Sequence, residues 1–239
     1  MAIQTTATDI HLRSSQATGL VATTPFSVSA WINTTWNAGT TASMVGIYGP
    51  ATDTPLGAPA TAMQIGSQVG NYDLCAWTWG GANLTQTATG YMTGYNGVWV
   101  FIVYTYDGTN HTLYRNGIQA STTVTTQQPG YLNQVYINGF PDSVAAEVVA
   151  MQVDQYALYR RTLSAAEVLT IYNAAGARHG IVNGLVCRYE FDELSQGASV
   201  SNVVDLTGNG NTLTSTGIGT VMTYAYPNTY ANSNLRPVQ

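Results

Sequence analysis

The chain has no lysine, and its basic side chains are seven arginines set against twelve aspartates and glutamates. Charged residues make up 8% of its 239 residues, about a third of the ~25% found in an average globular domain. Because phosphate backbones and anionic lipid surfaces are bound through clusters of lysine and arginine, we expect neither nucleic acid nor an anionic membrane as a partner. A surface with so few charges also repels other proteins weakly, which suits attachment to a larger assembly or homo-oligomerisation.

Long apolar runs are missing as well. The longest run, residues 98–104, is far shorter than the roughly 20 residues that span a bilayer, so no membrane insertion is expected. Residues 1–6 show no basic segment leading into an apolar one. We therefore expect no classical export signal, unless a leader has been removed.

Residue types for metal or nucleophilic chemistry are scarce. Cys75 and Cys187 could form one disulfide only if folding brought them together, and neither has the spacing of a zinc site. Two buried, unreactive thiols are the favoured interpretation. His11, His111 and His179 lie in separate segments, with no Ser or Cys nucleophile motif near any of them. No catalytic residues are predicted.

Apolar residues, by contrast, make up 45% of the chain, and a chain of this length is expected to bury a substantial core. Turn signals recur between short apolar runs, which is typical of an all-β sandwich or barrel. Over residues 26–32 apolar residues occupy every second position, which predicts a strand with one apolar face. Residues 98–106 are apolar nearly throughout and predict a central strand covered on both faces. The Asn116-Gly117 pair predicts a tight hairpin that completes a three-stranded meander.

One helix is expected, over residues 165–174. Ser164 and Glu167 have the spacing of a capping box, in which each side chain bonds the backbone N–H of the other residue. Leu163, just before the cap, supplies the apolar residue of a hydrophobic staple. The helix is predicted to stop at Gly176, because glycine is the usual residue after a helix end.

No duplicated unit and no low-complexity linker divides the chain, so we expect a single domain over residues 1–239. Its core is predicted to lie in residues 20–175. Residues 185–191 predict a further strand, and residues 185–216 form a returning strand and turn. Residues 217–239 are interpreted as a tail.

Three segments occur in order: FSVSAWI at residues 26–32, GVWVFIVYTYDG with LYRNG at residues 97–117, and VDQYALYRRTLSAAE at residues 153–167. Together they resemble the laminin-G-like branch of the concanavalin A-like lectin/glucanase superfamily. The resemblance covers residues 20–175. It implies a jelly roll of two curved antiparallel sheets, accompanied here by one short helix.

The C-terminal part departs from this pattern. Family members often begin with a strand similar to residues 185–193 and continue into a D-x-x-G-N-G-N loop, here residues 205–211, whereas in this chain both follow the helix. About 50 residues remain after Leu185, too few for a second two-layer core. We therefore expect an arrangement like a circular permutation, with residues 185–191 inside the same sandwich. Residues 221–227 resemble the C-terminal end of laminin-G-like proteins encoded by tailed bacteriophages.

Aromatic side chains supply the candidate ligand-binding surface. An exposed aromatic row can stack on sugar rings or on a protein partner. Packing between the sheets is an equally weighted alternative for the Trp77 and Trp79 pair, and the core is favoured for Trp99. The residues predicted to form the ligand-binding row are Trp31, Tyr72, Trp77, Trp79, Tyr91 and Tyr95.

The glycine-rich turn places the side-chain oxygens of Asp205, Thr207, Asn209 and Asn211 at alternate positions, which resembles half of a calcium loop. The bidentate glutamate that completes such a loop is missing. A turn held by Asp205, Asn209 and Asn211 is favoured over a Ca²⁺ site, because these side chains readily cap their own backbone. No resident cofactor is expected.

Some glucanases of this superfamily carry an E-x-D-x-x-E strand, whose nearest counterpart is EFDELS at residues 190–195. Ser195 stands at the acid position, so at most two of the three catalytic roles are present. We therefore expect no enzyme. Glu190, Asp192 and Glu193 are not expected to converge on an open cleft.

The leading functional prediction is a non-enzymatic structural protein of a phage particle. It would act as a capsid-surface decoration or adhesion protein, with a capsid or other virion protein as partner and a host-surface glycan as ligand. The alternative is a soluble carbohydrate-binding lectin module, cytoplasmic or extracellular. A glycoside hydrolase ranks third, because a fold-level analogy alone supplies no activity.

Overall fold

The structure, a computed structural model, describes residues 2–5, 10–14, 18–20, 23–36, 42–48, 62–67, 71–78, 83–124, 134–138, 149–175, 179–192, 199–217 and 223–225. These residues contain sixteen strands and one helix, and the strands form two eight-stranded sheets. Every strand pair is antiparallel. The predicted all-β sandwich with one short helix is confirmed.

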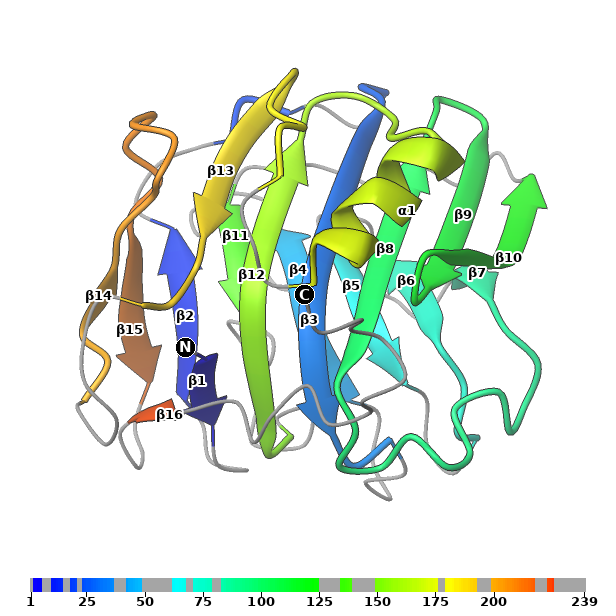
Figure 1. Cartoon of the computed structure of the whole chain (residues 1–239), viewed down its shortest axis with the longest axis horizontal. Helices are drawn as coiled ribbons and strands as arrows, with labels where there is room; N and C mark the ends of the chain where they lie inside the picture. The colour runs from blue at the N-terminus through cyan, green and yellow to red at the C-terminus, as the bar shows by residue number, and fades with distance from the viewer. Residues whose placement is uncertain are drawn as a thin grey trace, which may run out of the picture.

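The first sheet, sheet A, follows the order β10-β9-β8-β3-β12-β1-β16, with β13 also paired to β12 (Figure 1). Because β1 pairs with the start of β12 and β13 with its end, the two strands share one edge of β12. The strands of sheet A are β1 (Ala2–Thr5), β3 (Phe26–Thr34), β8 (Val100–Tyr106), β9 (Asn110–Arg115), β10 (Ile118–Val124), β12 (Met151–Tyr159), β13 (Leu185–Tyr189) and β16 (Thr223–Ala225).

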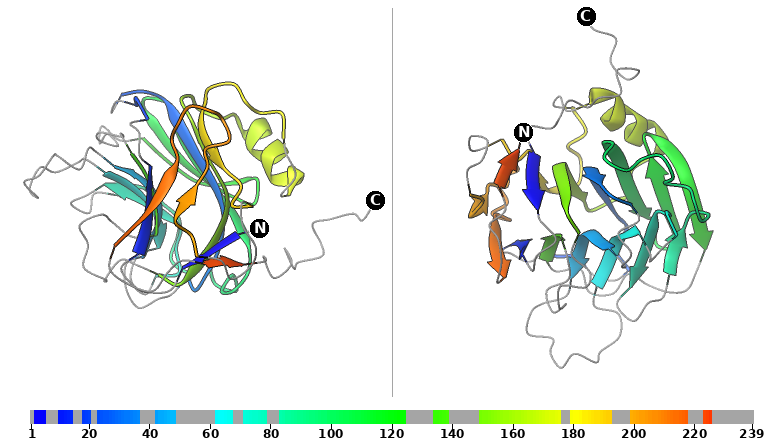
Figure 2. Two further views of the ribbon diagram at one scale, coloured as in Figure 1. Left: turned by 90° about the vertical axis from the view of Figure 1, so that its left-hand side faces the viewer. Right: turned by 90° about the horizontal axis from the view of Figure 1, so that it is seen from below.

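The second sheet, sheet B, follows the order β14-β15-β2-β11-β4-β5-β6-β7. Figure 2 shows the two sheets as layers, with the helix α1 on the outer side of one of them. The strands of sheet B are β2 (Ile10–Ser14), β4 (Ala42–Tyr48), β5 (Ala62–Ser67), β6 (Cys75–Thr78), β7 (Asn83–Gln86), β11 (Gln134–Ile137), β14 (Asn202–Val203) and β15 (Leu213–Gly217).

The predicted central strand β8 is buried along its whole length. Ile102 and Tyr104 belong to the main core between the sheets, whereas Phe101 and Val103 belong to a second cluster on the outer face of sheet A. That second cluster includes residues of α1, so the helix covers the outer face of the strand. The prediction of a strand covered on both faces is confirmed.

The β9–β10 hairpin turns at the predicted Asn-Gly pair. Asn116 and Gly117 have positive φ angles of 52° and 80°, as a type I′ turn requires. A Cβ atom on Gly117 would lie 2.9 Å from Leu169 Cδ1 of α1. Glycine at this position therefore allows both the positive φ angle of the turn and the close approach of the helix.

Helix α1 (Ala165–Ala174) begins with the predicted capping box between Ser164 and Glu167. Its end differs in one detail. The left-handed residue is Ala175 (φ 44°), whose N–H bonds the Tyr172 carbonyl oxygen, whereas the predicted Gly176 lies outside the described residues. Within the described residues, no helix combines the length and the apolar character needed to cross a bilayer.

The segment after the helix returns to the sandwich as predicted. β13 pairs with β12 in sheet A, and β15 pairs with β2 in sheet B. The segment interpreted as a tail also adds a strand, because β16 pairs with β1. Cys75 and Cys187 are free and buried, which confirms the thiol interpretation, and burial raises the pKa of both thiols.

Candidate functional site

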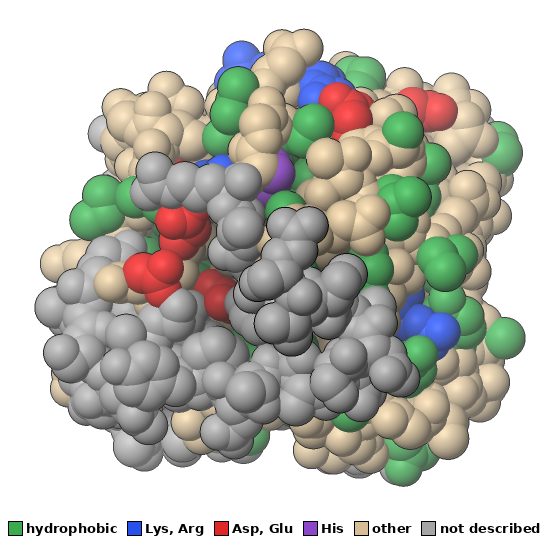
Figure 3. Space-filling view, viewed as in Figure 1, with side chains coloured by type: hydrophobic (Ala, Val, Ile, Leu, Met, Phe, Trp, Pro, Cys, Tyr) green, Lys and Arg blue, Asp and Glu red, His purple; other side chains and the backbone are tan. Residues whose placement is uncertain are grey.

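A pocket of about 500 Å³ opens on the outer face of sheet A, beside β13. Figure 3 shows this face of the molecule, where charged side chains are few among uncharged ones. The residues come from three segments: the end of the α1–β13 connection, β13 with the residue that follows it, and the glycine-rich turn. We call this the β13 pocket; it is lined by His179, Val182, Leu185, Arg188, Glu190, Leu206, Thr207 and Asn209.

An ion pair between Arg188 and Glu190 lies in the pocket wall. Because side chains two residues apart point to the same face of an extended chain, both extend outward, away from the core residues Cys187 and Tyr189. Arg188 Nη2 lies 2.7 Å from Glu190 Oε1, and the two side chains are only 10% and 13% exposed. Because both side chains are largely buried, the ion pair holds the two charged groups in fixed positions, and the pair as a whole carries no net charge.

His179 contributes an uncharged imidazole at neutral pH. Burial, and after it the nearby Arg188 guanidinium, lowers the pKa of His179 to about 4, while Glu190 opposes this shift. A neutral imidazole carries one donor and one acceptor nitrogen. Its Nδ1 atom is buried and has no hydrogen-bond partner in the described structure.

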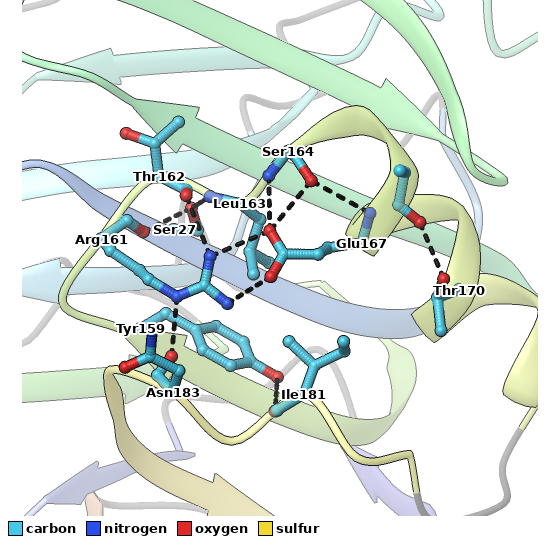
Figure 4. Close-up of polar contacts among 11 residues, drawn as sticks. Ser27, Tyr159, Arg161, Thr162, Leu163, Ser164, Glu167, Thr170, Ile181 and Asn183 are labelled. Carbon is cyan, nitrogen blue, oxygen red and sulfur yellow. Dashed lines mark hydrogen bonds and ion pairs between the residues drawn. The ribbon is translucent and has the colours of Figure 1, made fainter.

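The connection that carries His179 and Val182 is tied to the start of α1 (Figure 4). Arg161 donates from Nη1 and Nη2 to the two carboxylate oxygens of Glu167, at 2.9 and 2.6 Å, and from Nε to the Asn183 carbonyl oxygen at 2.8 Å. The paired guanidinium lowers the pKa of Glu167 to about 2. This Arg161 clamp fixes one wall of the pocket relative to the helix.

The glycine-rich turn supplies the other wall. The Asp205 carboxylate accepts five hydrogen bonds, from the Arg188 and Thr207 backbone N–H groups, the Thr207 hydroxyl, and both the backbone and the side chain of Asn211. The Asn209 side chain donates to the Val186 carbonyl oxygen of β13 at 2.9 Å.

These contacts fit a turn held by its own side chains and do not fit a Ca²⁺ site. The carboxylate oxygens of Asp205 face hydrogen-bond donors, whose positive ends a cation would have to displace. Among the described residues, no group of three or more His, Cys, Asp or Glu side chains could hold a metal ion. Asn209 lines the pocket and bonds β13.

A second pocket of about 410 Å³ adjoins the first and shares Leu185 and Asn209 with it. Its other lining residues include Arg160, which donates from Nη2 to the Thr18 carbonyl oxygen at 2.7 Å, and Asn211. The two pockets therefore meet at Leu185 and Asn209.

The two described tryptophans of the predicted aromatic row are not open to solvent. Trp31 is 2% exposed and stacks on Tyr172 of α1, with ring centroids 5.7 Å apart, so this ligand assignment was wrong. Trp77 is 5% exposed, which likewise rules out stacking on a ligand in this structure. Trp79 lies outside the described residues.

The predicted tyrosines are brought together only in part. Tyr72, Tyr91 and Tyr95 are half-buried and pack against the main core. The Arg115 guanidinium lies 3.9 Å from the ring centroid of Tyr91 and 4.3 Å from that of Tyr95. Cation–π contacts of this kind occupy ring faces that a sugar would need. None of the five predicted residues that the structure describes lines the β13 pocket, whose charged pair and histidine the sequence prediction missed.

Of the acidic residues that were not expected to converge on an open cleft, the described structure places one in the β13 pocket. Glu190 does line an open pocket. Asp192 is exposed and does not line it, and Glu193 lies outside the described residues. Glycoside hydrolysis generally takes two carboxyl groups on opposite sides of the bond. Among the described lining residues Glu190 is the sole carboxylate, and it is paired with Arg188.

Solved structures share the fold at low sequence identity. A candidate carbohydrate binding protein from Bacteroides ovatus superposes with a TM-score of 0.60 at 15% identity, covering 92% of this chain and 60% of that one. Domain 4 of an extracellular arabinanase from Geobacillus stearothermophilus, solved with arabinotriose, gives a TM-score of 0.51 at 12% identity over 70% of this chain and 74% of that domain. The receptor binding domain of botulinum neurotoxin D gives 0.51 at 13% identity, covering 74% and 44%.

This chain thus spans about 60% of the length of the Bacteroides protein. No curated protein sequence matches it. A laminin G family model described as "Concanavalin A-like lectin/glucanases superfamily" matches residues 6–169, more than half of the chain. With the two-sheet jelly roll observed above, this match shows that the chain belongs to the concanavalin A-like lectin/glucanases superfamily.

Proposed function

We propose that this protein is a non-catalytic glycan-binding domain and that the β13 pocket holds the sugar. The observation that carries the proposal is one pocket combining the Arg188–Glu190 pair, the neutral His179 and the amide of Asn209. Sugar hydroxyls both donate and accept hydrogen bonds. Arginine supplies donors, glutamate supplies acceptors, and a neutral imidazole and an amide supply both.

Apolar side chains that line the pocket can contact the C–H faces of a sugar ring. Val182 and Leu206 line the pocket and are exposed large apolar side chains. Contact with the C–H faces of a ring would remove this apolar area from water. Because the ion pair has no net charge and His179 is neutral, a neutral sugar is the favoured ligand.

A binding role without turnover is supported by the composition of the pocket. The described lining offers one carboxylate where hydrolysis generally takes two, so Glu190 has no partner carboxylate there to share acid and nucleophile roles. Glu190 is proposed to accept hydrogen bonds from sugar hydroxyls while it stays paired with Arg188.

Binding to an array of plant, bacterial and animal glycans tests the proposal, and Glu190→Gln and Asn209→Ala are the site variants. A hydrogen bond to a charged group contributes about 1.5–3 kcal/mol, so Glu190→Gln should weaken binding roughly ten- to hundredfold. Asn209→Ala should weaken it about three- to tenfold.

Asp107→Asn is the matched control, because it likewise removes one carboxylate charge, at an exposed residue between β8 and β9 that does not line the β13 pocket. It should leave the affinity unchanged. Affinity equal in the wild type and both site variants, or no binding to any glycan on the array, would contradict the proposal.

We also propose that the domain is carried on a phage particle, as a decoration or adhesion protein. What supports this is the sequence of residues 221–227 and the 8% charged content. Mass spectrometry of purified particles should detect the chain, and washing in ~1 M salt, where the screening length is roughly 3 Å, should leave it bound. Its absence from the particles would favour a free lectin.

We further treat residues 1–239 as a single domain, supported by the β13–β12 and β15–β2 pairings.

A further inference from the structure

We infer a second binding site, for a neutral polysaccharide chain, on the outer face of sheet A. Three side-chain amides lie there in one cross-strand row. Gln4 of β1 is in register with Gln152 of β12, which is in turn in register with Asn33 of β3. Neighbouring strands lie about 4.8 Å apart, so the row repeats one amide per strand across the sheet. We call it the amide row.

The amide row faces outward because its sequence neighbours face the core. Ile3, Ile32 and Val153 belong to the main core between the sheets. Successive side chains of a strand point to opposite faces, so Gln4, Asn33 and Gln152 point away from that core. The row lies near the start of β12, whereas Tyr159 at the end of β12 packs in the cluster beneath α1.

The amide row forms part of the wall of a groove of about 290 Å³. None of its described lining residues carries a charge. The lining residues are Gln4, Asn33, Thr34, Thr35, Gly97, Ala150, Met151 and Gln152. The side chain of Thr34 is committed to the fold, because its hydroxyl donates to the Ala150 carbonyl oxygen at 2.9 Å. The three amides form no hydrogen bond with any part of the described chain.

This chemistry selects the ligand class. Each amide offers two N–H donors and a carbonyl acceptor, which matches hydroxyl groups that donate and accept. A polyanion would meet no basic side chain in the groove, and it would be repelled by the net charge of −5. An apolar partner would leave the amides without hydrogen bonds and is disfavoured for that reason. A row that crosses three strands suits an extended chain of repeating rings better than a single ring.

This inference rests on the proposed glycan-binding function for the ligand class only. The groove and the β13 pocket share none of their described lining residues, so variants can be made in each site without changing a described residue of the other. A chain that contacts both sites would bind with higher apparent affinity than either site alone provides.

Affinity gel electrophoresis tests the inference with gels that contain dextran, laminarin, galactomannan or arabinan, and with alginate as the acidic counterpart. The wild type should be retarded by at least one neutral polysaccharide and not by alginate. Gln152→Ala and Asn33→Ala should each weaken this binding about three- to tenfold, as expected for the loss of one neutral hydrogen-bonding group.

Gln119→Ala is the matched control, because Gln119 is an exposed amide of the same sheet, on β10, outside the groove. It should bind as the wild type does. Gln152→Glu keeps the size of the side chain and removes its donors, so it repeats the test if the alanine variant unfolds. Thermal unfolding of each variant establishes that it is folded.

Three results would overturn the inference. The first is no retardation by any of the neutral polysaccharides, and the second is equal retardation of the Gln152→Ala and Gln119→Ala variants. The third is binding that Glu190→Gln abolishes and the amide-row variants leave unchanged. That last result would locate all binding in the β13 pocket, so the proposed function would stand while this inference failed.

Discussion

The Arg161–Glu167 pair gives a prediction that links the helix cap to stability and pH. The pKa of Glu167 is lowered to about 2 from an ordinary value of 4.5, chiefly by its hydrogen bonds with Arg161. Linkage converts a shift of this size into roughly 3 kcal/mol at most. The two side chains are 24% and 27% exposed, and solvent screening reduces the expected contribution to about 1 kcal/mol.

Two substitutions distinguish the contribution of the Glu167 charge to stability from that of the capping box. Glu167→Gln keeps a side chain that can complete the capping box and removes the charge, so it should lower the Tm by about 2–4 °C. Glu167→Ala also loses the bonds from the Ser164 backbone N–H and hydroxyl, at 2.9 and 3.0 Å. It should therefore lower the Tm by about 4–8 °C.

The pH dependence has a definite direction. A carboxyl group whose pKa is lowered by folding stabilises the protein fully above its unfolded pKa, and this contribution is lost as the pH falls through its folded pKa. The stability difference between the wild type and Glu167→Gln should thus be constant from pH 7 to about 5 and disappear near pH 2. Urea unfolding across this range measures it. A difference that is absent at pH 7, or that persists at pH 2, would refute the reasoning.

Four further outcomes are expected. Trp31→Ala should lower the free energy of unfolding by about 3–5 kcal/mol in urea, because it leaves a cavity beneath α1. The pKa of His179 is lowered to about 4, so the folded protein disfavours its charged form, and the wild type should lose more stability between pH 6.5 and 4 than His179→Gln does. Asp205→Ala should destabilise by about 2–4 kcal/mol, because it leaves buried donors unpaired, whereas a chelator should leave the Tm of the wild type unchanged. Neither the wild type nor Glu190→Gln should release reducing sugar from a β-glucan, and turnover by the wild type alone would show that the protein is an enzyme.

Features that depend on neighbours in the sequence could be predicted. The Asn116-Gly117 turn and the Ser164–Glu167 cap are set by residues within one turn of chain, and both are observed. β8 could be placed because an unbroken apolar strand must be covered on both faces. The return of β13 to the sandwich followed from the length of the remaining chain.

The site could not be predicted in the same way. Trp31 shares a strand face with Ser27 and Ser29 and therefore looked exposed, but α1, from a distant part of the sequence, covers it. The β13 pocket combines three segments that only the tertiary fold brings together. One signal was available: in a chain with so few charges, Arg188 and Glu190 stand two residues apart on a predicted strand, which places opposite charges on one face.

The most direct test of the central claim is the crystal structure of the protein with the glycan that binds most tightly on the array. We expect a sugar ring in the β13 pocket, with its hydroxyls hydrogen-bonded to Arg188, Glu190 and Asn209 and with Val182 or Leu206 against its C–H face. A ring bound elsewhere on the chain, with the β13 pocket empty, would contradict it.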